Sequence, residues 1–195
     1  MAILEATYAE IQGGFEKKIE DAAMGMILDM VQRSQYQYPL KSSIREITSN
    51  ALDSIRERDA AKAILKGKAK VADFYEEREG DLYKDSKFDP DYYDLNWLSD
   101  DTNVYISYVI GSMSEKDKLI IEDNGVGLGL YRLEKYFSIG YSTKRLMKLP
   151  LGKFGIGNKA PLSMNPFYTM ESRYNGRLFR FNIYFSTFRV SVSKY

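Results

Sequence analysis

The sequence predicts an α+β domain, because one long helical pattern and several strand patterns follow one another along the chain. Apolar residues recur at helical spacing over 42–58 and toward Leu65, whereas residues 104–110 alternate as a strand does, and further strands are expected at 118–122 and within 167–185. The 195 residues are enough for one domain with its own hydrophobic core. A composition of 44% hydrophobic and 28% charged residues is typical of a globular protein.

Composition also excludes several kinds of chemistry. The chain has no Cys, which excludes disulfides, thiolate catalysis and Cys-ligated zinc. It has no His, so any general base must be a carboxylate, Lys or Tyr. A net charge of +1 gives no electrostatic case for direct nucleic-acid binding. No apolar run is long enough for a membrane span and no signal-peptide pattern opens the chain, so we expect a cytoplasmic protein.

The N-terminal elements are expected to be helical. Residues 15–34 have the spacing of an amphipathic helix, and Pro39 interrupts the pattern. Ser42 or Ser43 is expected to cap the second helix, because an acidic residue follows Ser43 three positions later as in a capping box. Gly67 is the expected stop of that helix.

Residues 67–101 differ in character from the rest of the chain. They hold eleven Asp or Glu and five Lys or Arg, a local charge of −6, together with seven aromatic residues. We expect an acidic, aromatic insertion with little regular structure, packed by its own aromatic side chains. A partner-binding patch is the alternative interpretation.

The C-terminal half is expected to be mostly strands. Asn175-Gly176 between two alternating segments is typical of a tight β-hairpin. The elements expected here, in order, are strands at 104–110 and 118–122, a short helix at 130–137, a mobile loop at 141–150, a helix at 158–164, hairpin strands at 167–174 and 177–185, and a strand at 188–193.

The first candidate site segment is a polar stripe on the second helix. Glu46, Asn50 and Asp53 stand at i, i+4 and i+7, so they share one helical face. The side-chain oxygen of Asn50 can bind a hard cation such as Mg²⁺, and a carboxylate one turn away can deprotonate a water molecule. On the helix alone, a solvated polar face is the expected interpretation.

The second and third segments are glycine turns. Asp123 ends a strand and precedes Gly125 and Gly127, so its carboxylate can accept a hydrogen bond from an exocyclic amine of a flat ligand; an ordinary Asn-Gly turn is the alternative. A Rossmann fingerprint does not fit, because these glycines alternate.

Residues 152–157 form a glycine loop before an expected helix, where backbone N–H groups bind anions. Residues 128–160 carry seven Lys or Arg and one acid, which suits a triphosphate, although a flexible basic loop is the alternative.

Together the three segments resemble the GHKL (Bergerat-fold) ATPases: gyrase, the ninety-kilodalton heat-shock chaperone, histidine kinases and MutL. Arg45 to Asp53 is similar to the N box of that family. Asp123-Asn124-Gly125-Val126-Gly127 is similar to its first glycine box, and Gly152-Lys153-Phe154-Gly155-Ile156-Gly157 to its second. Ser142-Thr143-Lys144 resembles a lid element, and the resemblance covers residues 40–190.

The resemblance implies a role for each matched residue. It implies that Glu46 is the general base, that Asn50 holds Mg²⁺ and the phosphates, and that Asp123 binds adenine N6. The other nucleotide-binding positions that it implies are Asp53, Gly127, Lys144, Lys153, Phe154, Gly155, Ile156 and Gly157. The implied ligands are ATP or ADP, with Mg²⁺.

The resemblance also implies an architecture: one domain over 1–195, folded as a two-layer α/β sandwich with a mixed, mostly antiparallel sheet and helices on one face. Residues 1–39 would be a helical extension and 128–150 the ATP lid, whose closure would drive homodimerisation or engagement of a protein partner. The family's later threonine motif has Thr187 as its candidate, and its catalytic Lys or Arg comes from a following domain. We therefore expect the N-terminal part of a longer protein, of phage rIIA-like or microrchidia-like kind. A nucleotide-binding or protein-interaction module without useful turnover of its own is the alternative.

Overall fold

The computed structural model contains helices and antiparallel strands, which confirms the α+β class. It describes residues 15–18, 38–129, 132, 136, 142–151, 157–184 and 187–194. The chain divides into two compact units: the first comprises Met1–Ser43, Gly127–Tyr141 and Gly155–Tyr195, and the second comprises Ile44–Val126 and Ser142–Phe154. Each unit is described by itself below. In the described part of the chain, no helix combines the length and apolar character that a membrane crossing requires.

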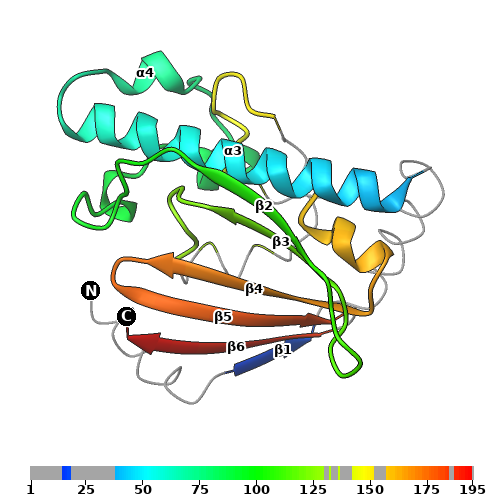
Figure 1. Cartoon of the computed structure of the whole chain (residues 1–195). Helices are drawn as coiled ribbons and strands as arrows, with labels where there is room; N and C mark the ends of the chain where they lie inside the picture. The colour runs from blue at the N-terminus through cyan, green and yellow to red at the C-terminus, as the bar shows by residue number, and fades with distance from the viewer. Residues whose placement is uncertain are drawn as a thin grey trace. The chain divides into compact units, whose positions relative to one another are not determined.

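The first unit contains a four-stranded antiparallel sheet in the order β1-β6-β5-β4 (Figure 1). The strands are β1 (Phe15–Lys18), β4 (Phe167–Tyr174), β5 (Arg177–Tyr184) and β6 (Thr187–Lys194). Phe179, Phe181 and Ile183 of the central strand β5 are almost completely buried and alternate with exposed residues. The period-two pattern of the sequence therefore gives this strand one core face.

The turn between β4 and β5 has the geometry that its sequence predicts. Asn175 has a φ of 44° and Gly176 a φ of 73°. Two central residues with positive φ make a type I′ turn, whose twist matches that of the flanking strands. The register runs from Tyr174 opposite Arg177 to Phe167 opposite Tyr184, so the hairpin prediction is confirmed.

Two helical expectations in the first unit need revision. Phe15–Lys18 form β1, which pairs with β6, so the helix expected from residue 15 does not begin there. Four residues cannot establish a 3.6-residue period, and pairing with β6 supplies their backbone hydrogen bonds; residues 19–34 lie outside the described part. Residues 157–163 form a 3₁₀ helix, η5 (Gly157–Ser163), where a helix was expected at 158–164, so the helical type is the new information. Its end is near the expected one, since Met164 and Asn165 both donate to the Pro161 carbonyl.

The long helix α3 (Pro39–Leu65), most of which belongs to the second unit, begins earlier than expected. Proline suits the first helical position because its fixed φ is already helical and its missing N–H is not needed there. The expected cap at Ser42 or Ser43 is wrong: both lie inside the helix, and the Ser43 hydroxyl has no hydrogen-bond partner. Gly67, with a φ of 67°, follows the helix end as expected.

The insertion at 67–101 packs onto α3 through its aromatic side chains. Its short helical turns are α4 (Val71–Phe74), η3 (Asp81–Ser86) and η4 (Pro90–Tyr92). The Phe88 ring lies 5.6 Å from Tyr75 and stacks on Tyr93 at 5.4 Å between centroids. Tyr75 shares a buried cluster with Ala60 of α3 and with Leu146 and Met147. Packing by its own aromatics is confirmed, but part of the packing surface comes from α3 and the 142–151 segment.

The second unit also contains a two-stranded antiparallel ribbon of β2 (Val104–Val109) and β3 (Lys118–Asp123). Val104 lies opposite Asp123, and Val109 opposite Lys118, as the two alternating segments predict. The ribbon thus ends at Asp123, the first residue of the candidate glycine turn.

Candidate functional site

The polar stripe of α3 passes from partly exposed to fully buried along the helix. The Glu46 side chain is 26% exposed, Asn50 is half-buried and Asp53 is 0% exposed. The stripe is therefore not the solvated face that is usual for such a pattern. Ala51 and Ile55, on the predicted apolar side, are buried as expected.

Asp53 is a buried carboxylate held by several donors. Its Oδ1 accepts a 2.9 Å hydrogen bond from the Leu151 N–H and lies 3.7 Å from the Arg56 guanidinium. Its Oδ2 accepts from the Lys144 ammonium at 3.4 Å. A buried carboxylate needs such partners, because an unpaired charge inside a protein is very costly. Asp53 thus fastens residues 144–151 to the helix.

Lys144 lies against the polar stripe. Its ammonium donates to Asn50 Oδ1 at 3.2 Å as well as to Asp53, and its side chain is 16% exposed. The backbone N–H of Lys144 donates to Ser142 Oγ at 3.2 Å, which shapes the local turn. The structure therefore brings together three of the predicted binding residues, from parts of the sequence more than 90 residues apart.

Glu46 makes a different kind of contact. Its Oε1 accepts from Arg45 Nη2 at 2.8 Å and Nε at 3.2 Å. The Arg45 side chain is 65% exposed, and ion pairs at such positions contribute about 1 kcal/mol or less. The carboxylate is therefore paired, but not fixed by this contact.

Asp123 forms a tight turn at the end of β3. Its Oδ1 accepts a 2.9 Å hydrogen bond from the Gly125 N–H, and Ser54 Oγ of α3 accepts one of 3.1 Å from Val126. Asp123 is exposed on one side, while protein atoms surround it on the others. Desolvation by this burial raises the pKa of Asp123; hydrogen bonds from Gly125 and Ser54 and the charges of Lys144 and Arg58 oppose the shift.

The glycines of this turn allow close approach to protein. A Cβ at Gly125 would stand 2.0 Å from Ser54 Oγ and 2.7 Å from the Ser54 backbone carbon. Within the first unit, a Cβ at Gly127 would stand 2.1 Å from the Arg173 carbonyl oxygen, and Gly127 has a φ of 70°. The space that a side chain would take at Gly125 and at Gly127 is thus filled by α3 and by β4 respectively, and the approach of a flat ligand to these glycines stays a prediction.

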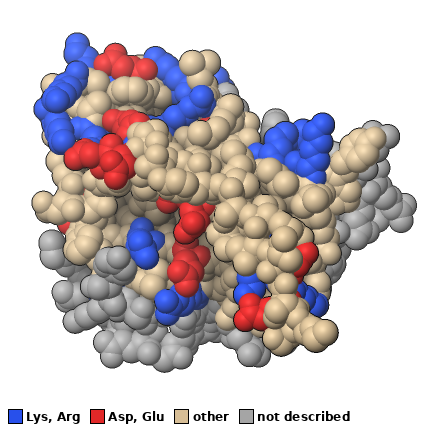
Figure 2. Space-filling model, viewed as in Figure 1, with Lys and Arg blue, Asp and Glu red and all other residues tan. Residues whose placement is uncertain are grey.

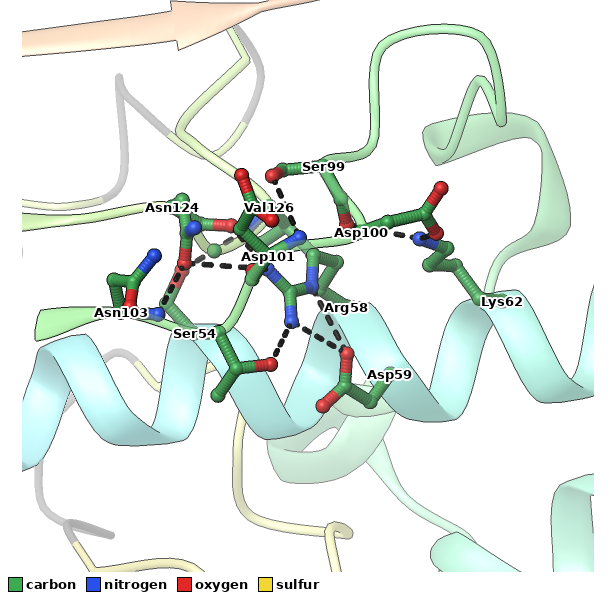
Figure 3. A network of polar contacts seen from close by, with 12 residues as sticks. Ser54, Arg58, Asp59, Lys62, Ser99, Asp100, Asp101, Asn103, Asn124 and Val126 are labelled. Carbon is green, nitrogen blue, oxygen red and sulfur yellow. Dashed lines mark hydrogen bonds and ion pairs between the residues drawn. The ribbon is translucent and has the colours of Figure 1, made fainter.

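Arg58, a buried arginine that the motifs did not indicate, donates hydrogen bonds to the Asp123 turn (Figure 3). Arg58 is 1% exposed, and its Nη1 donates to the Asn124 carbonyl at 2.7 Å and to Asn124 Oδ1 at 3.2 Å. A signal for it exists in the sequence. Arg58 lies seven residues after Ala51 and three residues after Ile55, and these spacings place it on the same apolar face of the helix. It is therefore a cation on an apolar face. Such a residue requires buried acceptors.

The third motif is described only at its end. Lys153, Phe154, Gly155 and Ile156 lie outside the described residues, and Gly157 is the first residue of η5 in the first unit. Thr187 begins β6. Of the expected lid, the described residues are 128, 129, 132, 136 and 142–150. The phosphate-binding role of this loop stays a prediction.

Among the described residues, no group of three or more acidic side chains could hold a metal ion by itself. Mg²⁺ keeps several waters and is bound by one or two protein oxygens together with substrate phosphates. Asn50 Oδ1 is a suitable oxygen, and Glu46 lies one helical turn away on the same face. The donor set therefore fits a magnesium ion delivered with a phosphate ligand.

Lys and Arg side chains alternate with Asp and Glu over the region of α4 and the end of α3 (Figure 2).

Comparison with models of protein families gives a match. A sequence model described as "Histidine kinase-, DNA gyrase B-, and HSP90-like ATPase" matches residues 92–191, just over half of the chain. The matched range includes Asp123 and the glycine segments but begins after α3, so Glu46, Asn50 and Asp53 lie outside it. A comparison with curated protein sequences found no match.

Proposed function

Because this chain belongs to the family of histidine kinase-, DNA gyrase B- and HSP90-like ATPases, we propose that it binds ATP with Mg²⁺ and hydrolyses it to ADP and phosphate. The family membership that the motifs predicted is confirmed, and a domain of this family binds ATP. The remaining steps are proposals. The observation that carries them is the meeting of Asn50, Asp53 and Lys144 in the unit that also holds the Asp123 turn.

Asp123 is the proposed contact of the adenine base. Its carboxylate has two oxygens with acceptor capacity beyond the hydrogen bonds from Gly125 and Ser54, and it is open to solvent on one side. A carboxylate oxygen there can accept a hydrogen bond from the exocyclic amine of adenine. Gly127 is proposed to lie beside the base.

Asn50 and Lys144 are proposed to receive the phosphates. Mg²⁺ would bind Asn50 Oδ1 and, when bound, would neutralise phosphate charge. Lys144 donates to Asn50 Oδ1 in the structure, and its ammonium can turn to a phosphate oxygen, which is a stronger acceptor than the amide. Asp53 would retain the Leu151 N–H and line the pocket. Residues 153–157 would add backbone N–H groups.

Glu46 is the proposed general base. Its carboxylate would accept a proton from a water molecule as the water oxygen attacks the γ-phosphorus. The bond from phosphorus to the bridging oxygen breaks, and ADP leaves with the electron pair. No His or Cys exists to take this role, and the exposed contact with Arg45 can exchange for one with water.

The experiment for hydrolysis is phosphate release by Glu46→Ala compared with wild type at saturating Mg-ATP. We expect turnover to fall by about 10²-fold or more, as for loss of a general base, with ATP affinity retained. Glu77→Ala, which removes an exposed carboxylate of the same unit, is the matched control and should leave turnover unchanged. Equal turnover in wild type and Glu46→Ala would remove Glu46 from the role of base.

A second candidate is a nucleotide-binding module with no useful turnover of its own. The pairing of Glu46 with Arg45 favours it, because the guanidinium competes with a water molecule for the same carboxylate oxygen. ATP binding by calorimetry without phosphate release at saturation would select this function. Robust turnover by the chain alone would exclude it.

The narrower expectations are proposals of the same kind. They are closure of residues 128–150 as a lid, nucleotide-dependent homodimerisation, a cytoplasmic location, and likeness to phage rIIA or microrchidia proteins. Light scattering with and without a non-hydrolysable ATP analogue tests the dimer directly. A mass that does not change on nucleotide binding would exclude it.

A further inference from the structure

Arg58 has the largest fully buried side chain in the described part of the chain, and it is a cation. We propose that Arg58 is a positioning residue for Asp123: it fixes the adenine-contacting turn on α3 and joins that turn to the end of the acidic insertion. The inference rests on the proposed function, because it assigns to Arg58 the geometry of the proposed base contact.

The first support is where Arg58 holds the turn. Its Nη1 donates to the carbonyl oxygen and the Oδ1 of Asn124, the residue next to Asp123. Asn124 Oδ1 also accepts a 3.0 Å hydrogen bond from the Asn103 N–H, so this amide ties the turn to the strand entry as well. The backbone just after Asp123 is therefore fixed by two independent segments.

The second support is the completeness of the network. Arg58 Nε and Nη2 donate to Asp59 Oδ1 at 2.9 and 2.7 Å, and Nη2 also donates to Thr102 Oγ1 at 2.9 Å. Nη1 donates further to the Asp101 carbonyl. Burying a guanidinium contributes little net stability compared with an apolar residue of similar volume, even when all its donors are satisfied. The network is better explained by the geometry that it imposes on the turn.

The third support is a neighbouring cation that bonds to the same segment but not to the turn. Lys62, one turn further along α3, donates to the Ser99 carbonyl at 2.8 Å and to the Asp100 carboxylate. Lys62 and Arg58 thus hold consecutive residues of the insertion end, 99–102, on one helix (Figure 3). Of these two cations, Arg58 is the one whose hydrogen bonds extend to the turn. Lys62 therefore provides a matched control.

Loss of Arg58 is expected to change the recognition of the adenine base and not the binding of the phosphates. A binding group must stay within about 0.5 Å of its productive position to keep its contribution. If Arg58 sets the position of Asp123, its loss should weaken discrimination for the exocyclic amine of adenine. The suitable probe is purine riboside triphosphate, which matches ATP except that it lacks this amine.

The experiment is calorimetric titration of ATP and of purine riboside triphosphate, with Mg²⁺, into the full chain. We expect wild type to prefer ATP, and Arg58→Lys to reduce the ratio of the two dissociation constants about tenfold, the value of one hydrogen bond to a charged group. Lys62→Met should lower the melting temperature but keep the ratio. In an Asp123→Asn background, Arg58→Lys should change the ratio no further.

Two results would overturn the inference. One is a folded Arg58→Lys variant whose ratio of dissociation constants equals that of wild type, and the other is a Lys62→Met variant in which this ratio falls as much as in Arg58→Lys. If Arg58→Lys fails to fold, Asn124→Ala and Thr102→Val replace it. Asn124→Ala should reduce the ratio and Thr102→Val should not, since Thr102 lies on the insertion side; the reverse order would also overturn it. A wild-type chain that binds neither nucleotide would contradict the proposed function itself. If the chain binds both nucleotides and the ratio of their dissociation constants depends on Asp123 but not on Arg58, this inference alone is contradicted.

Discussion

Asp53 and Asp123 are two carboxylates of one unit with opposite surroundings. Asp53 is fully buried, and its two oxygens accept from the Leu151 backbone and from Lys144. Asp123 is exposed on one side, and its Oδ1 accepts a hydrogen bond from Gly125 of its own turn. A ligand can use the open acceptor more readily than the closed one. We therefore assign direct base contact to Asp123 and support of the 144–151 segment to Asp53.

The raised pKa of Asp123 predicts that the charge on this carboxylate lowers the stability of the folded protein, to an extent that depends on pH. Because the folded-state pKa lies above the ordinary 3.8, the ionised form is disfavoured in the folded protein. The cost is absent below the unfolded pKa and complete above the folded one, so stability falls as pH rises through that window. Asp123→Asn should thus raise the melting temperature at neutral pH and give no gain near or below pH 3.8. Thermal unfolding across this pH range measures the difference; a gain that does not depend on pH would contradict it.

Lys144→Met is predicted to destabilise the protein by about 2 kcal/mol, because it removes a buried donor from Asp53 and from Asn50. Chemical denaturation measures the change. Lys148→Met is the control: Lys148 is an exposed cation of the same segment, bonded to the Ala72 carbonyl, and its loss should cost about 0.5 kcal/mol or less. Equal costs for the two variants would show that the contact with Asp53 contributes nothing.

At the level of elements, α3 supports both the turn and the 142–151 segment within its unit. Its side chains reach the turn through Ser54 and Arg58, and the segment through Asn50, Asp53 and Arg56. The insertion adds contacts to the same segment, including Glu76 N–H to the Leu146 carbonyl at 2.7 Å and Ser86 Oγ to the Ser142 carbonyl at 2.7 Å. The helix and the insertion therefore hold residues 142–151 between them.

Gly125→Ala tests the close approach of the turn to α3. The added Cβ would overlap Ser54 side-chain and backbone atoms, so the turn must shift, at a cost of about 3 kcal/mol and with loss of ATP affinity. Adding Ser54→Gly removes the two side-chain overlaps but leaves the backbone carbon at 2.7 Å, so rescue should be partial. Denaturation and ATP titration measure both effects.

Gly67→Asn is the matched control for that variant. Gly67 has a φ of 67° and open space beside it, and Asn tolerates this conformation, so the cost should be about 1 kcal/mol at most. A cost at Gly125 no larger than the cost at Gly67 would contradict the close packing of the turn.

Local patterns predicted the elements well where short-range chemistry decides them. Short strand patterns predicted β2 to β6, and Asn175-Gly176 predicted the hairpin turn. The start of α3 was missed because Pro39 was taken as an interruption, although proline also suits a first helical position. The motif predicted Lys144 as a site residue but did not predict its hydrogen bond to Asp53. A contact between residues 91 positions apart has no local signal in the sequence. Arg58 was not predicted as part of the site, because most of its acceptors lie on residues 101, 102 and 124, more than 40 positions away, and such contacts have no local signal.

At the scale of the whole molecule, the predicted site residues fall in both units. Glu46, Asn50, Asp53, Asp123 and Lys144 belong to the second unit, and Gly127 and Gly157 to the first. The family match runs through both, from residue 92 to 191. The three motifs predicted the family from their order along the chain. The grouping into units depends on contacts between distant segments, which the motifs do not contain.

The most direct test of the central claim is calorimetric titration of Mg-ATP into the wild-type chain, Asp123→Asn and Glu122→Gln. Glu122 is an exposed neighbouring carboxylate of β3 and serves as the control. We predict saturable binding to wild type and to Glu122→Gln, and binding about tenfold weaker or worse to Asp123→Asn, since one hydrogen bond to a charged group is lost. Absence of binding to the folded wild-type chain, or equal affinity in all three proteins, would contradict an ATP site built around the Asp123 turn.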